Sequence, residues 1–193
     1  MSTAATLAVC VLASGSKGNS VFVSDGDTSL LIDAGLSGIE IERRLKACGQ
    51  SPETLDAIVI SHEHNDHIQG AGVMSRRYAV PLYISKKSSR AAMSLLGKIN
   101  DLRYFENGAS FSLDNLIIHP FSTSHDAEDP SGFTITRDML KIGLATDLGI
   151  ITALVREHLK GSDLLILEAN HDPAMLDAGS YPWPVKQRIK GRT

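Results

Sequence analysis

Three histidines and an aspartate lie within six positions of one another, directly after an apolar segment. The segment is Ala57–Ile60, and the polar residues are His62, His64, Asp66 and His67. Because alternate side chains of a strand point to the same face, His62 and His64 are expected to leave a buried strand on a common side. Neutral imidazoles and carboxylates are ligands for Zn²⁺, Mn²⁺ and Fe. The spacing therefore predicts a metal site rather than a solvated loop that happens to be rich in histidine.

Further acidic and imidazole side chains follow other apolar segments. Four residues come at or just after the ends of predicted strands: Asp33, His125, Asp147 and His171. Loops at one edge of a rigid sheet can assemble a site from distant parts of a sequence. We therefore expect these residues to join the histidine-rich segment. His119 and His158 lie within a strand and a helix, and we interpret them as structural or exposed.

Short strands and helices account for most of the sequence, in a single domain that spans residues 1–193. Apolar patterns and turn signals predict strands at 7–13, 21–23, 30–33, 57–60, 82–84, 103–105, 110–113, 116–121, 133–136, 140–145 and 164–167. Helices are predicted at 37–48, 68–78, 88–96 and 152–160. The first helix begins at a capping box of Ser37 and Glu40. The strand at 164–167 is expected to be buried.

The composition is that of an ordinary globular protein, with a formal net charge of -3 and therefore no overall basic field for nucleic acid. Cys10 and Cys48 are too few for a disulfide framework and lack metal-ligand spacing, so we predict buried thiols. The apolar segment Thr6–Ala13 is short and has no preceding Lys or Arg. It is interpreted as a core strand rather than a secretory signal. We expect a cytoplasmic protein that does not contact a membrane.

The motif His-x-His-x-Asp-His after a buried strand resembles that of the metallo-β-lactamase superfamily. The resemblance implies an α/β fold of the α+β kind, a four-layer αββα sandwich with metal ions at one edge. Carried over motif by motif, it makes three histidines the ligands of one metal: His62, His64 and His125. It makes Asp66 and His67 ligands of the other metal, and Asp147 the carboxylate that bridges both. Asp33 matches the aspartate that supports this centre, by accepting hydrogen bonds from loops or a ligand imidazole.

Longer phrases resemble the YycJ/VicX (WalJ-like) branch of that superfamily. They lie at positions 14–20, 31–38, 124–129, 145–149, 168–172 and 181–189. The branch implies a bacterial cytoplasmic nuclease, a 5′→3′ exonuclease on double-stranded DNA, with two divalent ions (Zn or Mn, or Fe). Its Gly-His-Leu-Ser-Asn phrase, whose histidine completes the second metal site, has no counterpart before Thr193. We therefore expect a domain that is incomplete at the C-terminus, with a weakened second site.

Individual residues are expected to have the following roles in such a two-metal centre. A water that bridges the metals is acidified towards hydroxide and attacks phosphorus. Asp66 and His171 are the candidate catalytic residues, and His171 either donates a proton to the leaving oxygen, holds a phosphate or is structural. The glycine-rich loop at 14–20 supplies the candidate substrate contacts: Ser16, Lys17 and Asn19.

Two other functions remain open at this point. The same metal centre can hydrolyse a thioester or lactone, as in glyoxalase-like enzymes. Alternatively, the chain is a non-catalytic binding or regulatory module, or an inactive fragment, because its site is incomplete. The ligand types do not discriminate between Zn, Mn and Fe. The leading interpretation is a metal-dependent phosphodiesterase or nuclease whose partner is nucleic acid.

Overall fold

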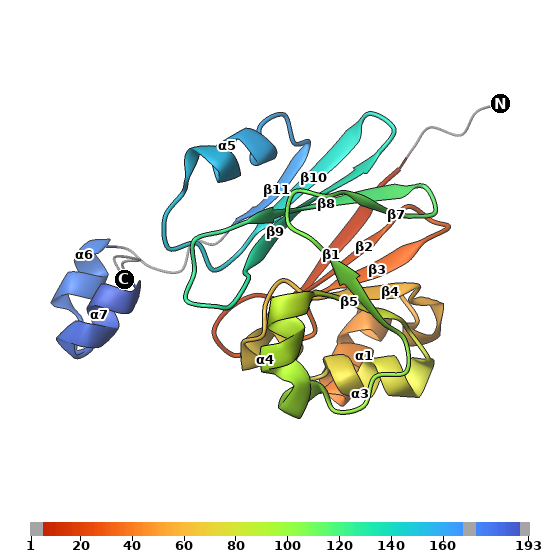
Figure 1. The fold of residues 1–193 in the computed structure, drawn as a ribbon, viewed down its shortest axis with the longest axis horizontal. Helices are drawn as coiled ribbons and strands as arrows, with labels where there is room; N and C mark the ends of the chain where they lie inside the picture. The colour runs from red at the N-terminus through yellow and green to blue at the C-terminus, as the bar shows by residue number, and fades with distance from the viewer. Residues whose placement is uncertain (1–5, 168–172, 190–193) are drawn as a thin grey trace.

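Two β-sheets lie face to face, and helices cover the outer face of each (Figure 1). The structure is a computed structural model and describes residues 6–167 and 173–189. Helices α1, α3 and α4 lie on one side, and α5 lies on the other. The αββα sandwich predicted above is therefore confirmed.

The first sheet has its strands in sequence order: β1 (Ala8–Ala13), β2 (Ser20–Ser24), β3 (Ser29–Ile32), β4 (Ala57–Val59), β5 (Leu82–Ser85) and β6 (Leu102–Phe105). The first three strands are antiparallel, and β3 to β6 are parallel. Parallel strands need crossover connections, which put helices on the face of the sheet. These are α1 (Gly38–Ala47), α2 (Asn65–Ile68), α3 (Ala71–Tyr78) and α4 (Lys86–Leu96), with a 3₁₀ turn at Pro52–Thr54.

The inner strands β2 to β5 of the first sheet are buried on both faces, which explains their apolar sequences. Ile58 and Leu82 pack in the core between the sheet and the helices. Val59 and Tyr83, one position further along, pack in the core between the two sheets. Alternate residues of a strand therefore pack into two different cores, one on each face of the sheet.

The second sheet is mainly antiparallel and has the order β11-β10-β9-β8-β7. Its strands are β7 (Phe111–Leu113), β8 (Leu116–Ser122), β9 (Ser131–Arg137), β10 (Leu140–Ala145) and β11 (Leu164–Leu167). Helix α5 (Ala153–Leu159) packs on it, and α6 (Pro173–Ala178) and α7 (Trp183–Ile189) follow. Among the described helices, none is long and apolar enough to cross a bilayer.

The helix predicted at 68–78 is wrong in its start and its continuity. The chain forms α2 at Asn65–Ile68 and then, after a break, α3 at Ala71–Tyr78. Gly70 lies at the break, where its N–H donates to the carbonyl of Ala34 at 2.8 Å. A Cβ there would lie 2.3 Å from the carbonyl oxygen of Leu36. Helical periodicity continues through this point, so only the close approach of another loop reveals the break.

The strand at 164–167 forms as predicted, but its burial was predicted wrongly. Leu164, Leu165 and Leu167 are between 43% and 45% exposed. Strand β11 is the edge strand of the second sheet and pairs with β10 only, within the described residues. An apolar sequence alone does not tell which neighbours a strand has.

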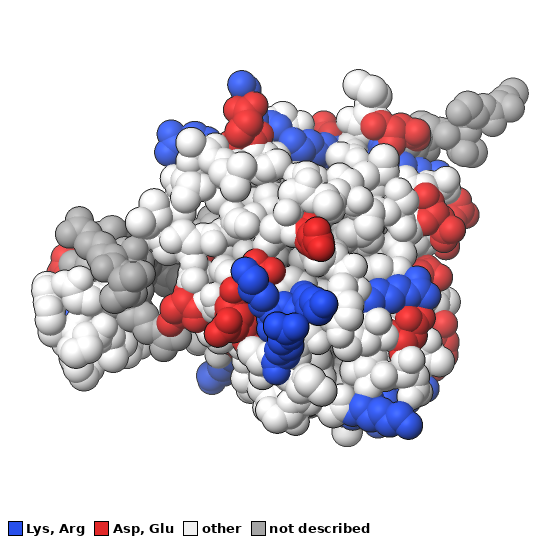
Figure 2. Space-filling view, viewed as in Figure 1, with Lys and Arg blue, Asp and Glu red and all other residues white. Residues whose placement is uncertain are grey.

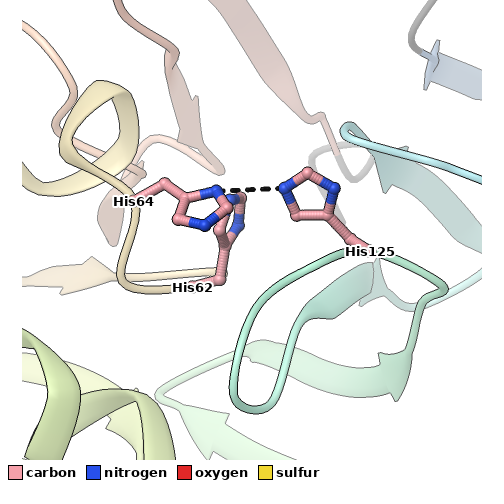
Figure 3. A group of neighbouring side chains, drawn as sticks. All are labelled: His62, His64 and His125. Atoms are coloured by element: carbon pink, nitrogen blue, oxygen red, sulfur yellow. Dashed lines mark hydrogen bonds between the residues drawn. The ribbon is translucent and has the colours of Figure 1, made fainter. Parts of the chain in front are cut away.

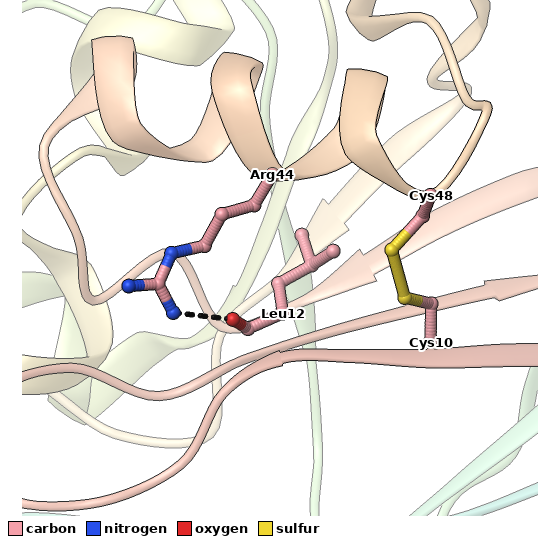
Figure 4. Close-up of a disulfide and its surroundings, with 4 residues drawn as sticks. All are labelled: Cys10, Leu12, Arg44 and Cys48. Carbon is pink, nitrogen blue, oxygen red and sulfur yellow. Dashed lines mark hydrogen bonds between the residues drawn. A yellow bond between two sulfur atoms is a disulfide. The ribbon is translucent and has the colours of Figure 1, made fainter.

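Cys10 and Cys48 form a disulfide, so the prediction of buried thiols is wrong (Figure 4). They are 38 residues apart in sequence. Helix α1 packs against β1, which brings the residue after the helix to the strand. The guanidinium of Arg44 donates to the carbonyl of Leu12 at 2.6 Å and holds the same two elements together.

Candidate metal centre

The predicted site residues converge at one edge of the sandwich, where strands of both sheets end. Asp33 directly follows β3, and His62 lies three positions after β4. His125 and Asp147 come shortly after β8 and β10 of the other sheet. The segments that carry them are tied together, since the N–H of Ser131 donates to the carbonyl of Ser61 at 3.2 Å.

Three imidazoles from two loops face one another (Figure 3). The ring nitrogens of His62, His64 and His125 lie within 4.8 Å of one another. Nε2 of His125 is 3.1 Å from Nδ1 of His64. His62 is only 2% exposed, and its Nε2 has no hydrogen-bond partner among the described residues. A buried nitrogen without a partner is costly unless a cation takes that place, so the group fits a divalent metal.

A second potential ligand group shares His62 with the first. It consists of His62, His67 and Asp147, whose ligand atoms again lie within 4.8 Å of one another. Nε2 of His67 is 2.9 Å from Oδ2 of Asp147 and 3.6 Å from Oδ2 of Asp66. Two imidazoles and a carboxylate are ligands that Zn²⁺ and Mn²⁺ both accept. Because one histidine belongs to both groups, the two groups adjoin each other, and its imidazole nitrogen serves one cation at a time.

Buried carboxylates set the charge of the centre. Burial alone would lower the pKa of His67, but the charge of Asp33 and hydrogen bonds to Asp147 and Asp33 raise it to about 10. Burial alone would raise the pKa of Asp147, but the hydrogen bond and charge of His67 lower it to about 2. Burial, together with the charge of His67, lowers the pKa of His62 to about 2. His62 is thus neutral at pH 7, with a lone pair available to a metal.

Backbone contacts hold the first turn of α2, which carries Asp66 and His67. The carbonyl of Asp66 accepts from the N–H of Asn19 at 2.7 Å, and that of His67 accepts from the N–H of Ala34 at 2.7 Å. At Gly35 a Cβ would lie 1.6 Å from the carbonyl oxygen of Asp66. Glycine is therefore required there for the approach of the two loops.

A small pocket of about 90 Å³ opens beside the second ligand group. It is lined by Ser14, Gly15, Ser16, Asn19, Asp66, Thr146 and Asp147. Its wall carries two of the predicted substrate-binding residues, Ser16 and Asn19, while Lys17 is exposed in the same loop. The Asn19 amide is already engaged, because Oδ1 accepts from Gly15 and Nδ2 lies 3.0 Å from Nε2 of His67. Asn19 thus contacts a potential metal ligand directly.

Two other predictions concern histidines elsewhere. His171 lies outside the described residues. The rings of His119 and His158 are in contact, tilted by 34° with centroids 4.8 Å apart, and neither residue belongs to the two ligand groups. Reasoning from sequence missed Ser61, whose hydroxyl contacts Asp33, His62 and His67. Its position immediately before the histidine motif was the only signal that could have identified it.

Comparison with known proteins supports the same fold. Residues 28–183 match the model of the β-lactamase superfamily domain. The chain is 40% identical over 183 residues to exodeoxyribonuclease WalJ of Streptococcus pneumoniae, covering 93% of this chain and 68% of that protein. It is 37% identical over 181 residues to exodeoxyribonuclease YycJ of Bacillus anthracis, covering 93% of this chain and 69% of that protein.

Solved structures agree at the level of the fold. Zinc-bound PqqB from Methylobacterium extorquens superposes with a TM-score of 0.69 at 16% identity, covering 85% of this chain and 64% of that chain. The combination of this fold, the family match and the long alignments to WalJ and YycJ leaves one assignment: the chain belongs to the metallo-β-lactamase superfamily.

Proposed function

We propose that the chain is a metal-dependent nuclease that hydrolyses phosphodiester bonds of DNA from the 5′ end. One observation carries the proposal: two potential ligand groups adjoin each other at His62, beside an open pocket. The names of the relatives, exodeoxyribonucleases at 37% and 40% identity, supply the substrate class. When bound, divalent cations acidify water into a nucleophile and stabilise charge on phosphoryl oxygens.

Residues of the chain are assigned here as metal ligands and as proton-transfer groups. His62, His64 and His125 would hold one cation, and His67 with Asp66 the other, with Asp147 available as a ligand to both. Asp66 is the candidate proton acceptor, because its side chain is 30% exposed and lines the pocket. His171 stays a candidate proton donor on sequence grounds alone. We leave the metal as Zn or Mn, since both accept these ligands.

Substrate contacts are proposed on the open side of the pocket. Ser16 and Lys17 are exposed there, and Asn19 acts from the side of the metal ligands. Arg76 donates to two backbone carbonyls, and Arg77 pairs with Glu42. We therefore assign neither arginine a role in substrate binding. Figure 2 shows Lys and Arg side chains gathered over α4, which packs against α2. The basic residues of α4, Lys86, Lys87 and Arg90, are a second candidate contact for the DNA backbone.

The function is tested with double-stranded DNA labelled at the 5′ or the 3′ end. We expect nucleotides to be released from the 5′ end in the presence of Mn²⁺ or Zn²⁺, and no release after chelation. His62→Ala should abolish the activity, whereas His158→Ala, a histidine outside the ligand groups, should preserve it. Circular dichroism checks that both variants are folded.

The alternatives are tested in the same experiment. A thioester substrate and a lactone are assayed beside the DNA and beside bis(p-nitrophenyl)phosphate. Thioester or lactone hydrolysis without phosphodiester cleavage would contradict the proposal and favour a small-molecule hydrolase. Binding of metal and DNA without any hydrolysis would favour a non-catalytic module.

A further inference from the structure

Ser61 lies at the point where the two ligand groups meet, and its hydroxyl contacts three neighbours. Oγ is 2.8 Å from Oδ2 of Asp33, 3.0 Å from Nδ1 of His62 and 3.2 Å from Nδ1 of His67. The residue is only 4% exposed, and its own N–H donates to Oδ1 of Asp33 at 2.8 Å. No role in the metal centre has yet been given to this hydroxyl.

The direction of each hydrogen bond follows from the number of protons. A carboxylate only accepts, so the single proton of the Ser61 hydroxyl is donated to Asp33. The oxygen then has only lone pairs for His62, which must contribute an N–H from Nδ1. Its Nε2 is left with the lone pair, and this is the buried atom that lacks a partner. His67 donates from Nδ1 to the same Asp33 oxygen at 2.8 Å, which leaves its Nε2 facing Asp147 at 2.9 Å.

We propose that Ser61 is a positioning residue. Its hydroxyl connects the carboxylate of Asp33, which orients His67 directly, to the ring of His62, and thereby links the two metal sites. The proposal rests on the two-metal function given above. Asp33 orients His67 directly and orients His62 through the hydroxyl of Ser61. One carboxylate therefore determines that Nδ1 of both rings carries a proton. Loss of the hydroxyl therefore weakens the site that His62 serves, whereas His67 keeps its direct contact with Asp33.

Metal affinity is the first measurement, and it needs no DNA. Outer partners of a ligand histidine contribute about 10- to 100-fold to metal affinity. We expect Ser61→Ala to lower the affinity for one equivalent of Mn²⁺ by that factor and to change the affinity for the other less, measured by calorimetric titration of the chelator-treated protein. Ser61→Thr keeps the hydroxyl and should restore wild-type affinities.

The matched control is Ser20→Ala. Ser20 is fully buried and its hydroxyl donates to the backbone carbonyl of the same Asp33 at 2.9 Å, without touching an imidazole. It should leave both metal affinities unchanged while costing similar stability. Equal losses in Ser20→Ala and Ser61→Ala would reduce Ser61 to a structural role and overturn the proposal. Unchanged affinities for both equivalents in Ser61→Ala would also contradict it.

The second measurement determines directly which ring nitrogen of His62 carries the proton. It uses the wild-type protein, so it does not require a folded variant. In ¹⁵N-histidine NMR spectra of the metal-free wild type, His62 should carry its proton on Nδ1 and its lone pair on Nε2. A proton on Nε2 in the wild type would overturn the proposal. Both measurements stand apart from catalysis, so metal binding with no DNA cleavage would contradict only the proposed function.

Discussion

Oδ2 of Asp33 lies 2.8 Å from Nδ1 of His67, and both side chains are buried at the base of the metal centre. Asp33 has a left-handed backbone, with φ of 59°, as it turns out of β3. A short polar side chain such as that of Asp or Asn tolerates this conformation better than most residues do. Asp33 therefore has two functions: its backbone makes the turn at the end of β3, and its carboxylate orients the potential metal ligand His67.

Replacing Asp33 tests that support. Asp33→Ala leaves the buried N–H groups of Ser61 and His67 without an acceptor. Breaking such a buried pair costs about 3–5 kcal/mol, which should appear in urea unfolding of the metal-free protein. Asp33→Asn tolerates the same backbone but lacks the charge, so a smaller loss is expected. Equal stability of Asp33→Ala and wild type would contradict the assigned contacts.

Stability of the metal-free protein should fall as the pH rises. The pKa of His67 is about 10 in the fold against an ordinary value of 6.5, so between these values only the folded chain keeps the proton. Its stabilising contribution is complete below pH 6.5 and is lost as the pH approaches 10, at up to about 1.4 kcal/mol per pH unit. Urea unfolding at several pH values between 6.5 and 9.5 measures the slope, and His67→Gln should flatten it. A stability that rises over this range would contradict the prediction.

The sequence was a good guide wherever an apolar segment ends. The apolar pattern of strands such as Ala57–Val59 predicts their burial, and the polar residues that follow mark their ends, so the sequence placed Asp33, His62, His125 and Asp147 at a common edge. Strand ends from both sheets meet at this edge, and that placement needs no knowledge of side-chain contacts.

Features that depend on contacts between distant segments were not predictable. The break at Gly70 arises from a loop carbonyl, and the disulfide from the docking of α1 on β1. The exposure of β11 depends on its neighbours. Ser61 was overlooked because a serine before a motif is common, and only the distances of its hydroxyl reveal a role.

Gly35→Ala should damage the second ligand group. The new Cβ would lie 1.6 Å from the carbonyl oxygen of Asp66, so the first turn of α2 must move. We expect a loss of about 1–3 kcal/mol or more in the free energy of unfolding and a weaker second metal equivalent in calorimetry. Gly26→Ala is the control, because it has a left-handed backbone but no atom within 4 Å of the new Cβ. It should cost stability while leaving the metal affinities unchanged, and a loss of affinity there would point to a general effect of strain.

Reduction of the Cys10–Cys48 disulfide should destabilise the fold without removing its metal sites. The bond closes a loop between residues 38 apart, and such cross-links contribute about 2–4 kcal/mol by restricting the unfolded chain. Urea unfolding with and without a reductant measures this difference in the wild type. Cys48→Ala should show the reduced stability under both conditions, because it has no bond left to reduce. If the reductant lowered the stability of Cys48→Ala as much as that of the wild type, the effect would not come from this disulfide. Mn²⁺ titration of the reduced wild type should give unchanged affinities, since neither cysteine contacts a ligand group among the described residues.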